Sequence, residues 1–439
     1  MSDIPADAAL PPRRARHAGT ALWTRHMARW LPAATLFYAM FIWPILYGRS
    51  PDTGPALAER VADTQSSPLN QIFFPAMFLL AAFAWVATSY RRSPALRDPV
   101  ILLTGLMLAL FVVSCAWSGV PGTALKRAIL QVTIVGTFVL SVIAADDVEG
   151  VVDRIFRMLV VVLFANMAVV AVTAPGPIGY EGLFPQKNGL GAAAAIGVLF
   201  ALYRIGTRGG LARLVGLATL IVCLALLVLS RSKTSLGLAV MVPPLMAALC
   251  IAARAGRLSV PLLVVTLVGG AVLVYFIGVA AYVWTFDSVA EALFGDPTLT
   301  TRTDIWAFAT SLAGRNPWLG WGFESFWATG VESPSFREAP GFVARMPHAH
   351  NGYIDIVLQT GFVGLALLAI LILAAFSAAG AVLRRAFGLG WLLVTLMFFM
   401  LLYNLLESAW FRGFDFMSMM FTLALALAAG ARHPRAGTP

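Results

Sequence analysis

The sequence predicts an all-α integral membrane protein with about twelve transmembrane helices. Hydrophobic residues make up 59% of the 439 residues, charged residues only 12%, and the mean hydropathy is +0.83. Such a chain has too little polar surface to fold in water. A membrane-spanning helix needs about 20 mainly apolar residues. Runs of this kind are centred near residues 39, 80, 109, 136, 164, 196, 221, 243, 272, 366, 398 and 421.

The positive charges predict the orientation of these spans. Residues 1–30 contain several arginines but no apolar core followed by a cleavage site, so we interpret them as a cytoplasmic basic tail rather than a signal peptide. Twelve spans that start there place most loop arginines on the same side, as the positive-inside rule expects. This topology explains the net charge of +10 and favours a membrane role over nucleic-acid binding.

The chain divides into five predicted segments. Residues 1–30 form the tail, 31–284 contain spans one to nine, 285–352 form a long outward loop, 353–431 contain spans ten to twelve, and 432–439 form a second cytoplasmic tail. Loops of this length are usually functional or disordered, and the many aromatic residues favour a folded, partly helical one. Some of its tryptophans are expected at the membrane interface, and some could stack on sugar rings. They are Trp306, Trp318, Trp321 and Trp327.

Several cations lie on the outward side, where topology does not require them. Every lysine of the chain is among them, and "LVLSRSKTSLGL" places Arg231 and Lys233 in a short turn between two spans. Arginine offers a planar fork of donors that matches phosphate oxygens, and lysine offers a mobile charge. These residues therefore predict a diphosphate site, with snorkelling to lipid headgroups as the alternative. The lysines are Lys126, Lys187 and Lys233.

Two further outward stretches are consistent with an anionic ligand. In "PGPIGYEGLFPQKNGLGAAAA" (residues 175–195), Lys187 and Asn188 lie where the sixth span begins, and the free N–H groups of a helix start favour an anion. An ordinary Asn188 cap is the alternative. "TTRTDIWAFATSLAG" predicts a short helix, capped by Thr301 or Thr303 and ended by Gly314. Arg302 at its start is unfavourable to the helix dipole, so it is either solvated or faces a negative ligand.

Two of the five histidines of the chain lie two residues apart in "MPHAHNGY" (residues 346–353), just before the tenth span. No other histidine lies outside, no carboxylate cluster stands beside them, and the cysteines fall inside predicted spans, so we predict no metal site. A neutral imidazole near the membrane surface is a common general base. The alternative is a histidine that caps the helix together with Asn351. The cysteines are Cys115, Cys223 and Cys250.

The last outward turn, "YNLLESAWFRGFDF", contains Asn404, Glu407, Arg412 and Asp415. We interpret Glu407 and Arg412 as an ordinary ion pair at the membrane surface.

Four motifs in order resemble the O-antigen ligase and polymerase family, which also includes bacterial protein O-oligosaccharyltransferases. "PHAHNGYIDIVLQTGFVGL" is similar to the His-x-His-Asn-x-aromatic signature before a late span, and "FPQKNGLGA" and "SRSKTSLG" are similar to two short family turns. "TRTDIWAFA" followed by "NPWLGWGFESF" is similar to the family's Gly-Arg-x-x-x-Trp and Pro-x-x-Gly-x-Gly run. Thr301 replaces the glycine that commonly precedes the arginine. The resemblance covers roughly residues 180–415.

The resemblance implies a glycosyltransferase of the bacterial inner membrane whose loop 285–352 faces the periplasm and carries the catalytic motif. The donor would be a glycan on undecaprenyl diphosphate and the acceptor a sugar hydroxyl of the lipid A–core oligosaccharide. No cofactor, metal or nucleic acid is implied, and membrane lipids surround the chain. His350, or else His348, would be the base of an inverting displacement, and Lys187, Arg231, Lys233 and Arg302 would bind the diphosphate. Asn188, Asn351 and Tyr353 would support them.

Three alternatives remain open from the sequence. A polymerase or a protein O-oligosaccharyltransferase would use the same donor with another acceptor. A secondary transporter is the alternative from a different class, although such proteins tend to place ionisable groups in mid-membrane and to contain internal repeats.

Overall fold

The computed structural model describes residues 13–47, 67–88, 93–294, 302–327 and 332–433, and within these ranges the chain is helical, with one isolated bridge between Gly176 and Gly179. Ten of the described helices are long and apolar enough to cross a membrane, and two shorter apolar helices follow near the C-terminus. Together they match the twelve predicted spans. The predicted all-α, multi-pass membrane fold is therefore confirmed.

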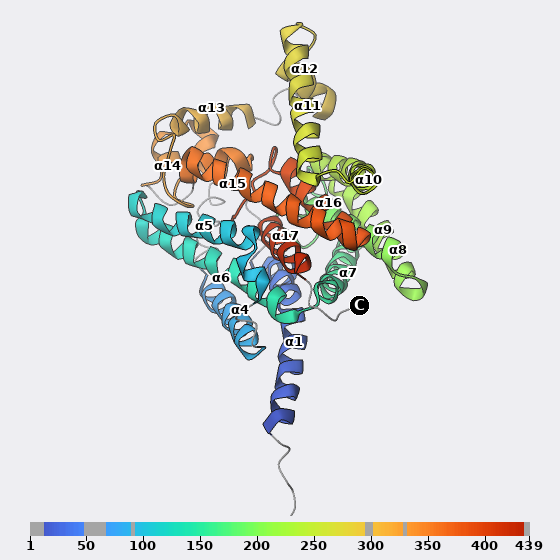
Figure 1. Ribbon diagram of the computed structural model, residues 1–439. Coiled ribbons are helices and arrows are strands. Elements are labelled where there is room, and N and C mark those ends of the chain that lie inside the picture. The colour runs from blue at the N-terminus through green and yellow to red at the C-terminus, as the bar shows by residue number, and fades with distance from the viewer. Residues whose placement is uncertain (1–12, 48–66, 89–92, 295–301, 328–331, 434–439) are drawn as a thin grey trace, which may run out of the picture.

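The first nine spans run from α1 to α11 (Figure 1). The first span consists of α1 (Arg13–Phe37), a π-helical turn η1 (Tyr38–Ile42) and α2 (Trp43–Tyr47). The next are α4 (Pro68–Ala87), α5 (Pro99–Ser114) with 3₁₀ turns at Pro94–Arg97 and Cys115–Trp117, α6 (Pro121–Ala145), α7 (Val148–Val172), α8 (Lys187–Thr207), α9 (Gly210–Ser230), α10 (Lys233–Ala255) and α11 (Val260–Ala280).

The long loop contains its own short helices, α12 (Phe286–Phe294), α13 (Arg302–Ala313), α14 (Pro334–Glu338) and a 3₁₀ turn at Gly341–Arg345. The last three spans are α15 (Gly352–Arg385), α16 (Phe387–Tyr403) and α17 (Phe416–Arg432). In Figure 1, α13 and α14 lie beside the start of α15. The prediction of a partly helical loop between spans nine and ten is confirmed.

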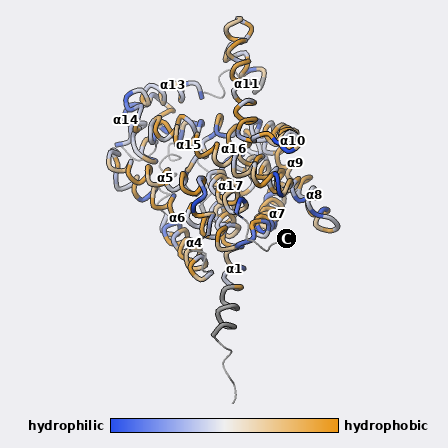
Figure 2. Tube along the Cα trace, in the orientation of Figure 1, coloured by the Kyte–Doolittle hydropathy of each residue, from blue (hydrophilic) through white to orange (hydrophobic). Residues whose placement is uncertain are grey.

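Ion pairs between arginines and acidic residues gather at one end of the bundle, which we call the basic end. Asp98, before α5, accepts from His433 at 2.9 Å and lies 3.5 Å from Arg432 at the end of α17. The α6–α7 turn contributes further pairs to this end. They are Arg29–Asp147, Arg204–Asp153 and Arg208–Glu149. Figure 2 shows that hydrophilic residues lie mainly at helix ends and in α13 and α14, with apolar residues between.

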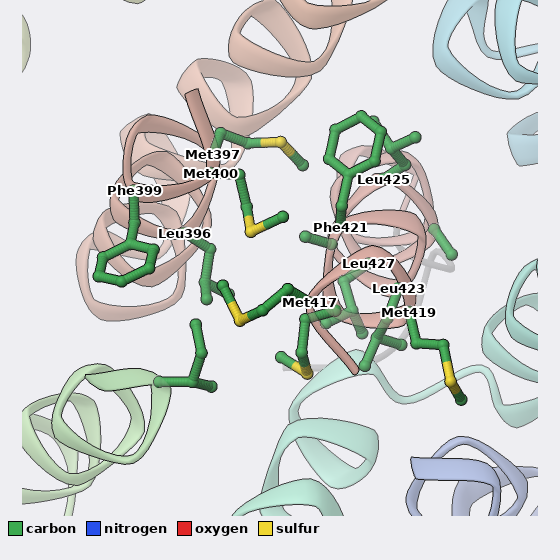
Figure 3. Close-up of a cluster of buried hydrophobic side chains, with 14 of the residues drawn as sticks. Leu396, Met397, Phe399, Met400, Met417, Met419, Phe421, Leu423, Leu425 and Leu427 are labelled. Carbon is green, nitrogen blue, oxygen red and sulfur yellow. The ribbon is translucent and has the colours of Figure 1, made fainter. Parts of the chain in front are cut away.

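The helices α16 and α17 lie in the centre of the protein, and nearly all of their residues are buried. A helix that is apolar on every side belongs inside a large core or a membrane bundle. Figure 3 shows Met397 and Met400 of α16 extending toward α17, on which Phe421 lies. This packing gives a rigid base to the α16–α17 turn, residues 404–415, which lies opposite the basic end.

The tenth span is not one continuous helix, because α15 breaks at Gly361, where φ is +65° and ψ is −165°. A Cβ at Gly361 would lie 2.1 Å from the carbonyl carbon of Trp318, so only glycine fits. Backbone groups of the long loop form hydrogen bonds with the peptide groups that the break leaves without helical partners. Phe362 N donates to Pro317 O and Trp321 N donates to Leu358 O, both at 2.7 Å. The break therefore fixes the long loop against the first turns of α15.

Candidate active site

Glu407, in the α16–α17 turn, joins three residues that the sequence places far apart. Its Oε1 accepts from Arg302 Nη2 at 2.9 Å and from Asn188 Nδ2 at 3.0 Å, and its Oε2 lies 3.1 Å from His350 Nδ1. Only 8% of Glu407 is exposed. A buried carboxylate needs such partners, because an unpaired charge is costly away from water. These four residues, Glu407, Arg302, Asn188 and His350, form what we call the Glu407 cluster.

The close approach of α15 to this turn depends on Gly352. Its N–H donates to Asn404 O at 2.9 Å and Glu407 O at 3.0 Å. A Cβ at Gly352 would lie 2.1 Å from Asn404 Oδ1, so a side chain there would push the two segments apart. The Asn-Gly pair after the histidines thus brings His350 within reach of Glu407.

His350 has the geometry expected of a positioned base. Its backbone is left-handed, with φ +52°, which is uncommon for a non-glycine residue and often marks a functional site. With the Glu407 carboxylate at Nδ1, the neutral ring carries its proton there. Nε2 then keeps a lone pair, and the side chain is 22% exposed.

The residue between the two histidines is held from both sides. Ala349 N donates to both oxygens of Asp355, at 3.1 and 3.3 Å, and Ala349 O accepts from Trp306 Nε1 at 2.9 Å. Asp355 also accepts from Trp327 Nε1 at 2.8 Å. Trp306 and Trp327 are therefore structural supports of the histidine turn.

His348 is half-buried, like His350, but it has different contacts. Its Nδ1 accepts from His350 N at 3.1 Å, so this nitrogen is unprotonated. Burial, with Arg412 and the neighbouring cations, holds the pKa of His348 well below its usual range. The ring lines a cavity together with Glu324, Asp355 and Arg412. This cavity has a volume of about 10 Å³, which is room for about one water molecule. Its position suits a neutral residue that supports His350.

The helix α13 forms as predicted, although Thr301 lies outside the described residues and Thr303 lies within the helix. Ile305 and Leu312 are buried with Phe326 and Val343 in a small apolar core of the loop itself. This packing holds Arg302 at the helix start and directs it to Glu407. A solvated Arg302 is therefore the wrong interpretation, and its negative partner in the structure is a carboxylate of the chain.

Asn188 does not cap a helix, which corrects the alternative considered for it. The helix α8 begins one residue earlier, at Lys187, with Gln186 in the cap position and no side-chain cap bond. The Asn188 side-chain amide donates to Glu407 Oε1 instead. Lys187 Nζ donates to Ile178 O at 3.2 Å, so it closes the preceding loop.

The turn between α9 and α10 packs against the same loop. Arg231 ends α9 in the left-handed region, with φ +53°, and its side chain is exposed, as is Lys233 two residues later. Tyr180 N donates to Leu229 O at 3.1 Å, which ties the loop to the turn. Within the described parts of the chain, no hydrogen bond or ion pair joins Arg231 or Lys187 to the Glu407 cluster.

The remaining predicted residues have structural contacts. Asn351 caps α15, because its Oδ1 accepts from Tyr353 N at 3.0 Å and Ile354 N at 3.1 Å, while its Nδ2 donates to Leu405 O. Asn351 caps this helix without the help of His350. Tyr353 donates to Leu401 O at 2.8 Å. Both residues thus fasten the start of α15 to the end of α16.

The predicted Glu407–Arg412 pair does not form: among the described residues the ion-pair partners of Glu407 are Arg302 and His350. Arg412 lies instead in the field of two largely buried acids. Burial raises the pKa of Glu324, opposed by Arg127 and Arg412, and burial also raises the pKa of Asp415, opposed first by Arg412. Arg412 therefore balances the acids beneath the site.

Arg127 of α6 is the second counter-charge of Glu324. Its Nη1 donates to Glu324 O at 2.5 Å and lies 4.0 Å from the carboxylate. We expect Arg127→Leu to lower the free energy of unfolding by about 3 kcal/mol, because the buried Glu324 loses one of its two counter-charges and its backbone carbonyl loses a donor. Thermal unfolding of the purified protein in detergent measures this effect.

The matched control is Arg315→Leu, which removes an exposed pair with Glu338 and is expected to change stability by at most about 0.5 kcal/mol. Equal losses in the two variants would contradict the assignment of Arg127 as a buried counter-charge.

Glu407 and Asp355 are the site residues that the sequence interpretation missed. The sequence pairs Glu407 with its neighbour Arg412 and gives Asp355 no role. Within the described ranges, no three His, Cys, Asp or Glu side chains come together in a group that could hold a metal ion.

Part of the chain is similar to known proteins. Residues 192–369 match the family model described as O-Antigen ligase, and this segment contains Arg231, Arg302 and both histidines. The Exopolysaccharide production protein ExoQ of Rhizobium meliloti (strain 1021) is 29% identical over 212 residues. That alignment covers 46% of this chain and 47% of the relative, so it spans about half the length of each protein. The multi-pass helical chain is therefore similar, over this matched segment, to the O-antigen ligase family.

Proposed function

We propose that the chain is a glycosyltransferase that moves a glycan from undecaprenyl diphosphate to a sugar hydroxyl, and that this hydroxyl belongs to the lipid A–core oligosaccharide. The observation that carries the proposal is the Glu407 cluster, in which a partly exposed imidazole stands beside a buried carboxylate and an arginine. The site would face the periplasm from the inner membrane, with the basic end in the cytoplasm, as the positive-inside rule requires.

The proposed reaction uses His350 as the general base. Its Nε2 takes the proton of the acceptor hydroxyl while that oxygen attacks the anomeric carbon of the donor. The bond from this carbon to the diphosphate oxygen breaks, and the diphosphate leaves with the electron pair, so the anomeric configuration is inverted. The Glu407 carboxylate stabilises the imidazolium through Nδ1–H. The base and its orienting acid thus have separate roles.

The leaving group gains negative charge, and cations at the site are proposed to stabilise it. Arg302 pairs with Glu407 through Nη2. The other N–H donors of its guanidinium are then left for phosphate oxygens. Arg231, Lys233 and Lys187 border the same end of the bundle and would complete the diphosphate site. By contrast, Arg315 and Arg337 of the loop are paired with surface acids, so we assign them no role in binding.

A polymerase that extends a lipid-linked glycan is the second candidate function. It is favoured by the similarity to ExoQ, whose name assigns it to exopolysaccharide production. Both functions share the donor and the base, and they differ only in the acceptor.

Transfer by the purified protein in liposomes distinguishes these functions. We expect lipid-linked donor glycan to appear on lipid A–core, with an unchanged rate in the presence of a chelator. Extension of the lipid-linked donor itself would favour the polymerase, and transfer to protein Ser or Thr would favour a protein O-oligosaccharyltransferase. Flux of lipid-linked glycan without any transfer would contradict the whole proposal.

A further inference from the structure

A second concave surface lies at the basic end, away from the Glu407 cluster. It is a groove of about 640 Å³ between the end of α8, the middle of α10 and the start of α16, a volume in the range of small-molecule sites. These helices lie on the right of Figure 1, whereas α13 and α14 lie on the left. The walls are mostly apolar. They include Leu202, Gly206, Pro244, Ala247, Phe387 and Trp391.

The position of the groove along α8 places it in the membrane leaflet at the basic end. Its wall residues Leu202 and Thr207 are 14 to 19 positions beyond Asn188 on α8, so they lie about 20–30 Å along the helix from the Glu407 cluster. This distance is close to the full thickness of a bilayer core. The groove is therefore separate from the candidate active site.

One arginine at the mouth of the groove has no carboxylate partner in the described part of the chain. The guanidinium of Arg254 lies 5.8 Å from the ring centroid of Phe387, a wall residue, and Arg254 forms no ion pair among the residues that the structure describes. The nearby arginines Arg204 and Arg208 are, by contrast, paired with acids of α7. An apolar groove with one uncompensated cation at its mouth fits a ligand with an apolar chain and an anionic head.

We propose that this groove binds one anionic phospholipid of the leaflet at the basic end, with an acyl chain between α8, α10 and α16 and its phosphate at Arg254. Basic pockets between transmembrane helices on the cytoplasmic side are suited to acidic headgroups. An anion without an acyl chain would make no contact with the apolar walls. A lipid without net negative charge would be bound less tightly, because it lacks the attraction to Arg254. The inference does not depend on the proposed glycosyl transfer.

Native mass spectrometry of the delipidated full-length protein in detergent tests the headgroup. The protein is titrated with phosphatidylglycerol or with phosphatidylcholine of the same acyl chains. We expect one phosphatidylglycerol to bind about fivefold more tightly than phosphatidylcholine, which is the effect of one arginine near an acidic headgroup. Arg254→Gln, a change of an exposed side chain, should abolish this preference.

Gly206→Leu tests the groove. Gly206 lines the groove and a Cβ built there meets no atom within 4 Å, so a side chain can start from this backbone position without a clash. We expect it to weaken the binding of phosphatidylglycerol at this site about tenfold or more, since the acyl chain loses its place. The matched control is Gly270→Leu on α11, another helical glycine with no atom within 4 Å of its Cβ, which should bind lipid like the wild type.

Three results would overturn the proposal. The first is equal binding of the two lipids that neither Arg254→Gln nor Gly206→Leu changes. The second is displacement of phosphatidylglycerol from this site by undecaprenyl phosphate, which would make the groove part of the donor path. The third is a change of oligomeric state in Gly206→Leu at unchanged lipid binding, which would show that a second copy of the chain covers the groove.

Discussion

His350→Ala is expected to lower the rate of glycan transfer about 10²–10⁴-fold, the usual contribution of a general base. The residue is the one histidine of the "HAH" turn whose ring reaches both solvent and a carboxylate. The measurement is the initial rate of transfer from a lipid-linked donor by the purified protein. Binding of the donor should change little, because Arg302 and the outward lysines remain in place.

His348→Ala is the matched comparison, since it removes the same chemical group two residues away. His348 accepts the backbone N–H of His350 and its pKa lies well below the usual range, so we assign it a positioning role. We expect a smaller loss of rate than in His350→Ala. A full loss in His348→Ala together with an active His350→Ala protein would reverse the assignment of the base.

Most of the fold could be predicted from the sequence because each span is a local pattern. A run of about 20 apolar residues has to cross the membrane as a helix, whatever the rest of the chain does. All twelve predicted centres fall in or beside a helix of the structure. The break at Gly361 was not predicted, because a glycine inside an apolar run is ordinary in a membrane helix. Its cause is the backbone of residues 317–322, a tertiary contact.

The candidate site could be predicted only in part, because the sequence shows local patterns but not tertiary contacts. His350, Arg302 and Asn188 could be selected because a charged or polar group at the outward end of a span is locally unusual. Their common partner Glu407 could not, because the choice between Arg412, five residues away, and Arg302, 105 residues away, depends on how α13 folds back on the bundle. The roles of Trp306 and Trp327 depend on the same folding.

Glu407→Gln is expected to lower the transfer rate about 10²–10⁴-fold, by analogy with loss of the carboxylate behind the histidine of a catalytic triad. The amide keeps the size of the side chain but removes the charge that stabilises the imidazolium. Its NH₂ group can also turn toward His350 Nδ1, which would favour a ring protonated at Nε2 and unable to accept a proton there. The same transfer assay measures the loss.

A purely structural role for Glu407 would show a different pattern, because the same carboxylate neutralises Arg302. In that case activity would fall only as far as the folded fraction falls, and Glu407→Gln measured well below its unfolding temperature would keep most of its transfer rate per folded molecule. If Glu407 orients the base, this rate falls about 10²–10⁴-fold even where Glu407→Gln is fully folded. Glu407→Asp should then retain more activity than Glu407→Gln at similar stability. The transfer rate per folded molecule therefore decides between a scaffold and a positioning acid.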